Sequence, residues 1–167
     1  NQSHIIQGDT AFLQIIGVDN TSCQGQGFQT ISRGDLIKAM TSMSQEPGTK
    51  SQDKSVTTRQ TEVISLDSLF LAPKSNIMQI LLTHDPSHWR GEVIPKTDIP
   101  LTLSGHTHAG QVRLFGYPLS SLMFTESEGW YHNDGQSLHI NTGLGCTLPV
   151  RIGVPPEITV ITLLHQQ

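Results

Sequence analysis

Three histidines of this chain stand where their imidazoles could bind metal ions. His106 and His108 form a His-Thr-His sequence directly after Gly105, and His84 precedes them by about two dozen residues. Neutral imidazole is a strong ligand for borderline divalent metals. A His-X-His pair also suits surface loops, however, and a single His at the end of a strand is more often a hydrogen-bonded loop residue. A metal site therefore depends on the elements that position the three side chains.

Each histidine site directly follows a segment that predicts a strand. Residues 77–83 are mostly apolar, as in a strand buried on both faces, and His84 comes next. Residues 100–104 form a second, shorter candidate strand. A tight turn at Gly105 can then bring the imidazoles of His106 and His108 to the edge of the sheet. Because open α/β sheets gather site residues at the carboxyl ends of their strands, we expect the two strands to lie side by side and end at the same edge.

The rest of the chain predicts a mixed α/β (α+β) fold. The apolar run 11–18 suits a strand, and apolar residues at helical spacing after Asp35 predict a helix from Leu36. Residues 44–76 are rich in polar residues, Gly and Pro, so we expect a flexible insertion there. Three further segments have strand-like composition, namely 112–115, 138–141 and 158–164.

Charge and composition exclude several classes of partner. Ten Lys and Arg stand against 14 Asp and Glu, and the net charge of -4 gives no electrostatic reason to expect a nucleic-acid partner. The longest apolar runs are far shorter than the ~20 residues of a membrane-spanning helix, so we expect no transmembrane segment within this chain. Cys23 and Cys146 are too few and too far apart for a disulfide framework or a four-cysteine zinc site, and we expect free thiols.

Several motifs, taken in order, resemble the C-terminal motifs of calcineurin-like metallophosphoesterases. Upstream, residues 15–19 and 34–39 are similar to segments between the second and third site motifs of that family. Ser-Gly-His-Thr-His followed by Gln111 is most similar to a bacterial branch of Bacteroidetes type, often found in membrane-anchored proteins. The stretches that carry the resemblance are Leu-Leu-Thr-His-Asp-Pro at 81–86, Leu-Thr-Leu-Ser-Gly-His-Thr-His at 101–108, Ile-Asn-Thr-Gly-Leu-Gly at 140–145 with Arg151, and Pro-Glu-Ile-Thr-Val-Ile-Thr at 156–162.

The resemblance implies a two-layer β-sandwich flanked by helices and a two-metal centre that hydrolyses phosphate mono- or diesters. By resemblance, His84 and His106 ligate one divalent ion and His108 the other, with Mn, Fe, Zn or similar metals as the cofactors. In such centres the ions lie ~3.5–4 Å apart and lower the pKa of a bridging water, which attacks the phosphorus as hydroxide. The resemblance leaves the substrate open beyond a phosphoester, and it allows a membrane-anchored or a cytoplasmic parent.

The chain lacks the remaining ligand motifs of that family, which are Asp-X-His, a bridging Gly-Asp and Gly-Asn-His. Gly8-Asp9 spells the second motif, but no proper strand precedes it, and we interpret it as a turn. We therefore expect residues 1–167 to be the C-terminal portion of a single metallophosphoesterase domain, whose missing N-terminal half is its partner. Unpaired strand edges left without that half would favour self-association.

Two alternatives stay open at this point. The chain could be a non-catalytic fragment or pseudoenzyme that only packs or binds metal weakly, or its three histidines could form one zinc site with an open position. Outside the histidine motifs, Trp89 with Arg90 could line a substrate pocket or pack in the core, and Arg151 could contact phosphate or brace a loop. Trp130 with Tyr131 is predicted to lie in a loop flanked by glycines, whereas we expect His88 and His139 to be structural.

Overall fold

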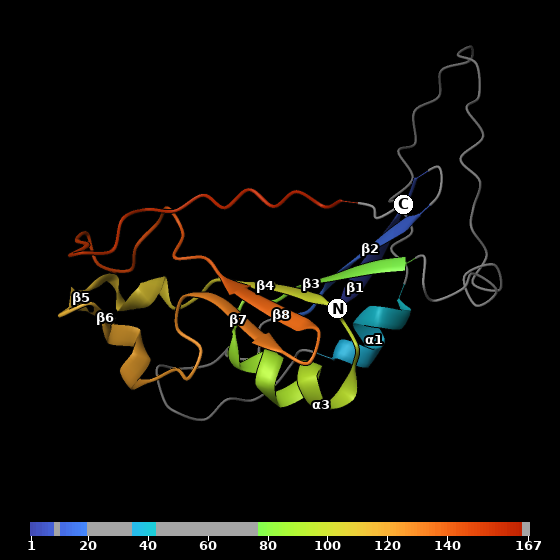
Figure 1. The fold of residues 1–167 in the computed structure, drawn as a ribbon, viewed down its shortest axis with the longest axis horizontal. Helices are drawn as coiled ribbons and strands as arrows, with labels where there is room; N and C mark the ends of the chain where they lie inside the picture. The colour runs from blue at the N-terminus through green and yellow to red at the C-terminus, as the bar shows by residue number, and fades with distance from the viewer. Residues whose placement is uncertain (9–10, 20–34, 43–76, 165–167) are drawn as a thin grey trace, which may run out of the picture.

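The computed structural model describes residues 1–8, 11–19, 35–42 and 77–164, and these residues form an α/β fold (Figure 1). This confirms the fold class expected from the sequence. The predicted insertion at 44–76 and Asp9 of the predicted turn lie outside the described residues. The strands are β1 (Gln2–Gln7), β2 (Phe12–Gly17), β3 (Ile77–Leu82), β4 (Leu101–Ser104), β5 (Arg113–Leu114), β6 (Tyr117–Pro118), β7 (Gly129–Asn133) and β8 (Gln136–Ile140).

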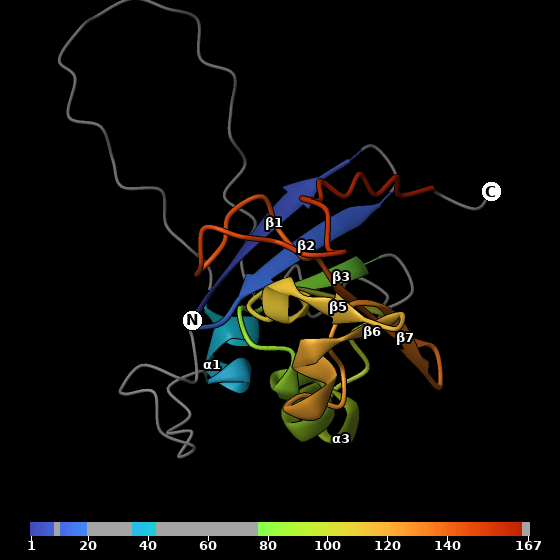
Figure 2. The ribbon, with the colours of Figure 1, turned by 90° about the vertical axis from the view of Figure 1, so that its left-hand side faces the viewer.

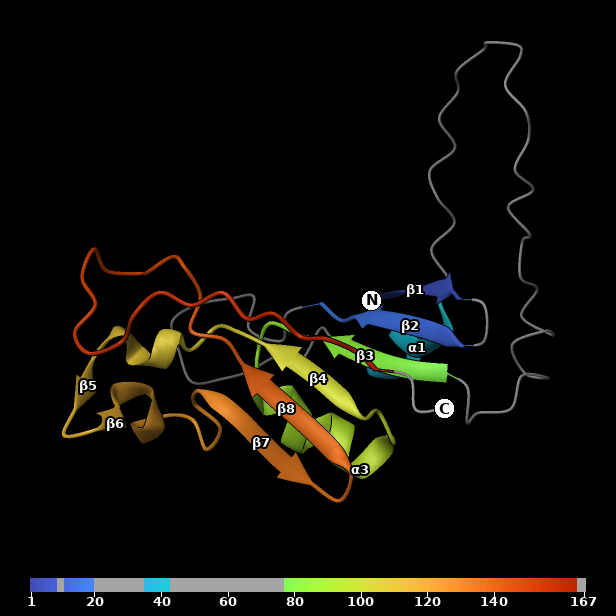
Figure 3. The same ribbon diagram turned by 45° about the horizontal axis from the view of Figure 1, so that its top comes forward.

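Six of these strands form one sheet in the order β1-β2-β3-β4-β8-β7, and β5 pairs with β6 separately. The four inner strands run parallel, while β1 and β7 are antiparallel to their neighbours at the two edges (Figure 3). Strand β3 pairs with β4 in parallel register, with Leu82 opposite Leu103. The prediction that the strands before the two histidine sites lie side by side is therefore confirmed.

The helices cover one face of the large sheet. Helix α1 (Leu36–Thr41) begins at Asp35, whose carboxylate accepts a hydrogen bond from the Lys38 N–H at 2.8 Å, as an N-cap residue does. A π-helical segment (Trp89–Val93) continues into α3 (Ile94–Lys96) and carries the chain from β3 across to β4. Figures 1 and 2 show α1 and α3 on the same side of the sheet. In the part of the chain that the structure describes, no helix has the length and apolar character needed to cross a membrane.

The hydrophobic core lies between this sheet face and the helices. Trp89 is its largest member and is 1% exposed, so it packs in the core and does not line a pocket. Burying a side chain of this size removes a large apolar area from water. The other buried members come from β2, α1, β3, the crossover and β8, and they are Ile16, Leu36, Ala39, Leu81, Val93, Ile99, Leu138 and Ile140.

Two predictions about strands are wrong. Residues 158–164 are extended but form no strand, because no neighbouring strand among the described residues supplies a hydrogen-bonded ladder. Ile158 and Val160 are 75% and 87% exposed, while Thr159 between them is half-buried, so the side-chain alternation of a strand is present without its partner. Trp130 and Tyr131 belong to β7 and not to a loop, because Gly129 and Gly135 mark the ends of a strand and its turn.

Candidate metal centre

The ends of β3 and β4 are fastened together where the first two histidines leave the sheet. The Thr83 N–H donates to the Leu103 carbonyl at 3.0 Å, which continues the ladder one residue beyond β3. The carbonyl of His84 then accepts from the Ser104 hydroxyl at 2.9 Å and from the Gly105 N–H at 3.4 Å. The backbone at His84 is therefore held by the residues that directly precede His106.

This arrangement brings two imidazoles into direct contact. Nε2 of His84 lies 2.8 Å from Nδ1 of His106, and their ring centroids are 4.6 Å apart at an interplanar angle of 65°. Burial lowers the pKa of His106, and the neighbouring His84 lowers it further. A lowered pKa favours the neutral imidazole, which is the form that binds metal.

His108 is oriented by the chain that follows β8. Its Nδ1 lies 3.0 Å from the carbonyl oxygen of Thr142. Because a carbonyl only accepts, the neutral imidazole of His108 carries its proton on Nδ1, and Nε2 then has the free lone pair. Gly143, at φ +74°, lies under the same ring, and a Cβ there would stand 3.6 Å from Nδ1 of His108. The Asn-Thr-Gly sequence after β8 thus fixes both the tautomer and the position of the third imidazole.

The loop that carries His106 and His108 adopts an unusual backbone. His106, His108, Ala109 and Gln111 all have positive φ, at 70°, 47°, 52° and 60°. Residues other than glycine rarely have a positive φ. Such backbone strain persists only where the surroundings enforce it, most often at functional sites. Gly110, at φ +65°, allows the close approach of the next helix, because a Cβ there would lie 2.6 Å from the Ser120 nitrogen.

Two buried side chains hold this loop in its strained form. The Thr107 hydroxyl donates to the Ser127 carbonyl at 2.6 Å. The Gln111 amide donates to the carbonyls of Leu148 and Val150 at 2.7 and 2.8 Å, and its oxygen accepts two backbone N–H groups at 147 and 148. The sequence includes Thr107 and Gln111 only as motif residues and does not indicate their roles, since their partners lie 20 to 39 residues away.

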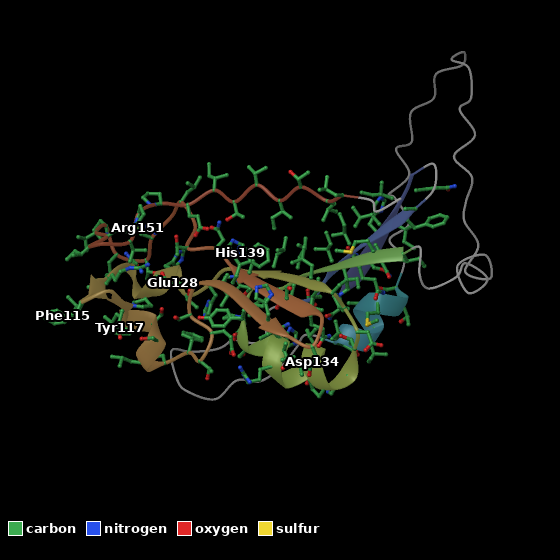
Figure 4. All side chains as sticks on the ribbon, in the orientation of Figure 1. Phe115, Tyr117, Glu128, Asp134, His139 and Arg151 are labelled. Carbon is green, nitrogen blue, oxygen red and sulfur yellow. The ribbon has the colours of Figure 1, made fainter. Side chains whose placement is uncertain are left out.

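Arg151 braces a loop, which is one of the two roles that the sequence left open for it. Its guanidinium donates to the carbonyls of Thr142 and Gly143, both at 3.0 Å, and also to that of Gly145. Figure 4 shows Arg151 on the C-terminal loop, away from His139 on the sheet. Since Thr142 also orients His108, this brace supports the third histidine.

His88 and His139 have the structural roles expected of them. His88 is buried, its Nδ1 lies 3.2 Å from the Thr83 hydroxyl, and burial lowers its pKa. His139 lies within β8 and bonds through Nε2 to the Thr159 hydroxyl at 2.9 Å. Cys146 is a free, exposed thiol, as expected, whereas Cys23 lies outside the described residues.

The described residues do not form a complete metal cage by themselves. Within them, no group of three or more His, Cys, Asp or Glu side chains is arranged to hold one ion. The structure brings His84 and His106 together as a pair and orients His108 separately. This geometry does not support a single zinc site built from all three histidines.

Comparisons with known proteins find several relatives. The uncharacterized metallophosphoesterase YkuE of Bacillus subtilis is 30% identical over 179 aligned residues, which cover 98% of this chain and 54% of that protein. An uncharacterized metallophosphoesterase of Helicobacter pylori is 34% identical over 64% of this chain and 29% of its own length. A protein of Danio rerio named transmembrane protein with metallophosphoesterase domain is 37% identical over 50% of this chain and 20% of its own.

The chain thus spans about half the length of the Bacillus relative and less of the other two. No family model matches the chain, and no solved structure matches it.

Proposed function

Since this chain belongs to the calcineurin-like metallophosphoesterase family, we propose that it supplies His84, His106 and His108 to a two-metal centre that hydrolyses a phosphate mono- or diester. The observation that carries the proposal is the 2.8 Å approach of His84 Nε2 to His106 Nδ1 at the ends of two parallel strands. We assign these two nitrogens to one divalent ion and His108 Nε2 to the other. Mn, Fe and Zn are the candidate metals.

The residues fit such an ion. Two imidazole nitrogens that bind one ion at about 2.1 Å stand roughly 3.0–3.4 Å apart for bond angles between a right angle and the tetrahedral value. The observed 2.8 Å between His84 and His106 is close to that spacing, so a small rotation of either ring accommodates an ion. The unprotonated Nε2 of His108 supports the assignment in a different way, because its tautomer is already the one that a ligand needs.

Bound divalent ions supply a hydroxide nucleophile near neutral pH and neutralise charge on the phosphoryl oxygens. The residues of this chain position that chemistry. The Thr142 carbonyl holds the proton on Nδ1 of His108. Thr107 and Gln111 keep the strained loop from relaxing away from the site, so that the ligands need not reorganise when substrate binds.

We further propose that the remaining ligands come from an N-terminal half of the same domain. Two observations support this partner. The described residues form no three-ligand cluster, and the chain covers 54% of its Bacillus relative. The strand edges at β1 and β7 would also let the isolated chain self-associate. A membrane-anchored parent is consistent with the name of the Danio rerio relative.

The test is metal-dependent hydrolysis of an aryl phosphate and a bis-aryl phosphodiester by the parent protein. His84→Ala should lower turnover by about 100-fold or more, because even the outer partners of metal ligands cost 10–100-fold when removed. The matched control is His132→Ala, an exposed histidine of β7 that should leave turnover unchanged. Full activity of the His84 variant at saturating metal would contradict the assignment.

A further inference from the structure

A pocket lies beside the candidate metal centre, and none of the residues that line it is a proposed metal ligand. Its volume is about 340 Å³, and it is lined by Ser87, Arg90 and Gly91 on one side and by residues 123–126 on the other. This is within the ~300–1,000 Å³ range of small-molecule sites. Ser87 lies three residues after His84, and residues 123–126 form the loop that follows the short helix Leu119–Leu122.

Phe124 connects this pocket to the metal centre. Its ring meets the ring of His106 edge to face, with centroids 5.6 Å apart and an interplanar angle of 87°. The loop that carries Phe124 is also tied to the His-Thr-His loop, because the Thr107 hydroxyl donates to the Ser127 carbonyl. The Phe124 ring therefore separates the pocket from His106, and a hydrogen bond links the two loops that carry these residues.

The two charged residues of the pocket lining, Arg90 and Glu126, form an ion pair. Glu126 is 4% exposed, and its Oε1 accepts hydrogen bonds from Nε, at 2.9 Å, and Nη2 of Arg90. A buried carboxylate needs such a partner, and because Arg90 and Glu126 are the only charged residues of the lining, the lining carries no net positive charge. The remaining lining residues are uncharged, and Met123 and Phe124 have the large apolar side chains among them. Methionine adapts readily to apolar ligands. The others are Ser87, Gly91 and Thr125.

We propose that this pocket holds the uncharged apolar group, aromatic or alkyl, that is esterified to the phosphate of the substrate. The inference rests on the proposed function, because it takes the phosphoryl group to lie at the histidines. Phe124 then packs against the organic group on one side while it contacts His106 on the other. Phosphoesters whose organic part carries a second negative charge at this position bind less well, since no unpaired cation of the lining meets that charge.

The test uses non-hydrolysable ligands, so that leaving-group reactivity does not enter. Dissociation constants of methylphosphonate, phenylphosphonate and 4-carboxyphenylphosphonate are measured by calorimetry on the metal-loaded parent protein. We expect phenylphosphonate to bind at least tenfold more tightly than methylphosphonate, and the carboxylated ligand to lose most of that gain. Phe124→Ala should reduce the phenyl-to-methyl preference to near one, and Phe124→Leu should keep part of it.

Two further variants sharpen the outcome. Phe115→Ala removes a side chain that is 98% exposed at the turn between β5 and β6 and does not line the pocket, so the preference should persist. Glu126→Gln releases the Arg90 charge and should tighten the carboxylated ligand relative to phenylphosphonate. If the parent hydrolyses phosphoesters but binds methyl- and phenylphosphonate equally, with no effect of Phe124→Ala, this inference is overturned and the proposed function stands. If it neither hydrolyses phosphoesters nor binds any phosphonate, both fail.

Discussion

Nε2 of His84 and Nδ1 of His106 lie 2.8 Å apart, although the two residues belong to different loops of the chain. The contact follows from the parallel pairing of β3 with β4, which ends both strands at one edge of the sheet. Two neutral imidazoles this close to each other can share one proton, and a cation between them would satisfy both lone pairs at once. This pair is the part of the fold from which the proposed metal centre is built.

The first prediction concerns the 167-residue chain on its own. We expect it to bind divalent metal weakly and to show no appreciable hydrolysis of an aryl phosphate or a bis-aryl phosphodiester. No cluster of three ligand side chains exists among the described residues, so an ion at the histidines would lack part of the ligand set that a protein metal site needs. Turnover assays with added manganese check this, and robust manganese-dependent turnover by the purified chain would show that it needs no partner.

The second prediction concerns the core. Trp89→Ala should lower the free energy of unfolding by about 3–5 kcal/mol, because the side chain is almost fully enclosed between sheet and crossover. Trp130→Ala is the matched control, since that ring is 49% exposed and should cost clearly less. Urea unfolding followed by circular dichroism measures both. Equal losses for the two variants would mean that Trp89 is not the centre of the core.

The third prediction concerns the clamp on the histidine loop. Gln111→Ala removes four hydrogen bonds that tie the buried Gln111 side chain to the backbone of residues 147–150. We expect the free energy of unfolding to fall by about 1–3 kcal/mol and amide exchange at Thr147 and Leu148 to become faster. Gln136→Ala, which removes one bond to the Thr97 carbonyl, should leave exchange at 147 and 148 unchanged. Hydrogen exchange read by mass spectrometry distinguishes the two, and unchanged protection in the Gln111 variant contradicts the clamp.

The fourth prediction concerns pH. Burial alone would raise the pKa of Glu157, but hydrogen bonds from the Thr142 N–H and from the hydroxyls of Thr159 and Thr142 outweigh it and hold this pKa below 4.5. A lowered carboxyl pKa stabilises the fold above the unfolded pKa, and this contribution disappears as the pH falls through the folded value. Nearby His139 favours the same ionised form.

We therefore expect residues 155–164 to become sensitive to an acid-active protease below about pH 4.5. Glu157→Gln should remove most of this pH dependence, because its amide does not titrate in that range. A wild-type digestion profile that stays flat down to pH 3, at equal protease activity, would rule out this anchor.

The sequence predicted the inner strands well, because apolar runs such as those of β2 and β3 end at glycine or at polar residues that stop a strand. It missed β1, whose Ile5 and Ile6 stand among polar residues and pair only at the sheet edge. It also assigned a strand to 158–164 from composition alone. Composition reports side-chain preference, whereas a strand needs a neighbour to bond with.

The candidate site, like the fold, could be predicted from the sequence only in part. His84 and His106 could be paired from the sequence, because parallel strands bring their ends to one edge. The orientation of His108 could not, since the Thr142 carbonyl that fixes its tautomer lies 34 residues further along the chain. The pocket beside Phe124 was equally hidden, because the Arg90 and Glu126 that close one wall are 36 residues apart.

Anomalous diffraction from crystals of the manganese-loaded parent protein tests the central claim most directly, because it locates the ions independently of activity. We expect one anomalous peak within coordination distance of both His84 Nε2 and His106 Nδ1, and a second ~3.5–4 Å away that contacts His108 Nε2. Anomalous peaks that contact none of these three nitrogens would contradict the account. So would an ordered, fully metal-loaded protein in which the three imidazoles contact only other protein groups.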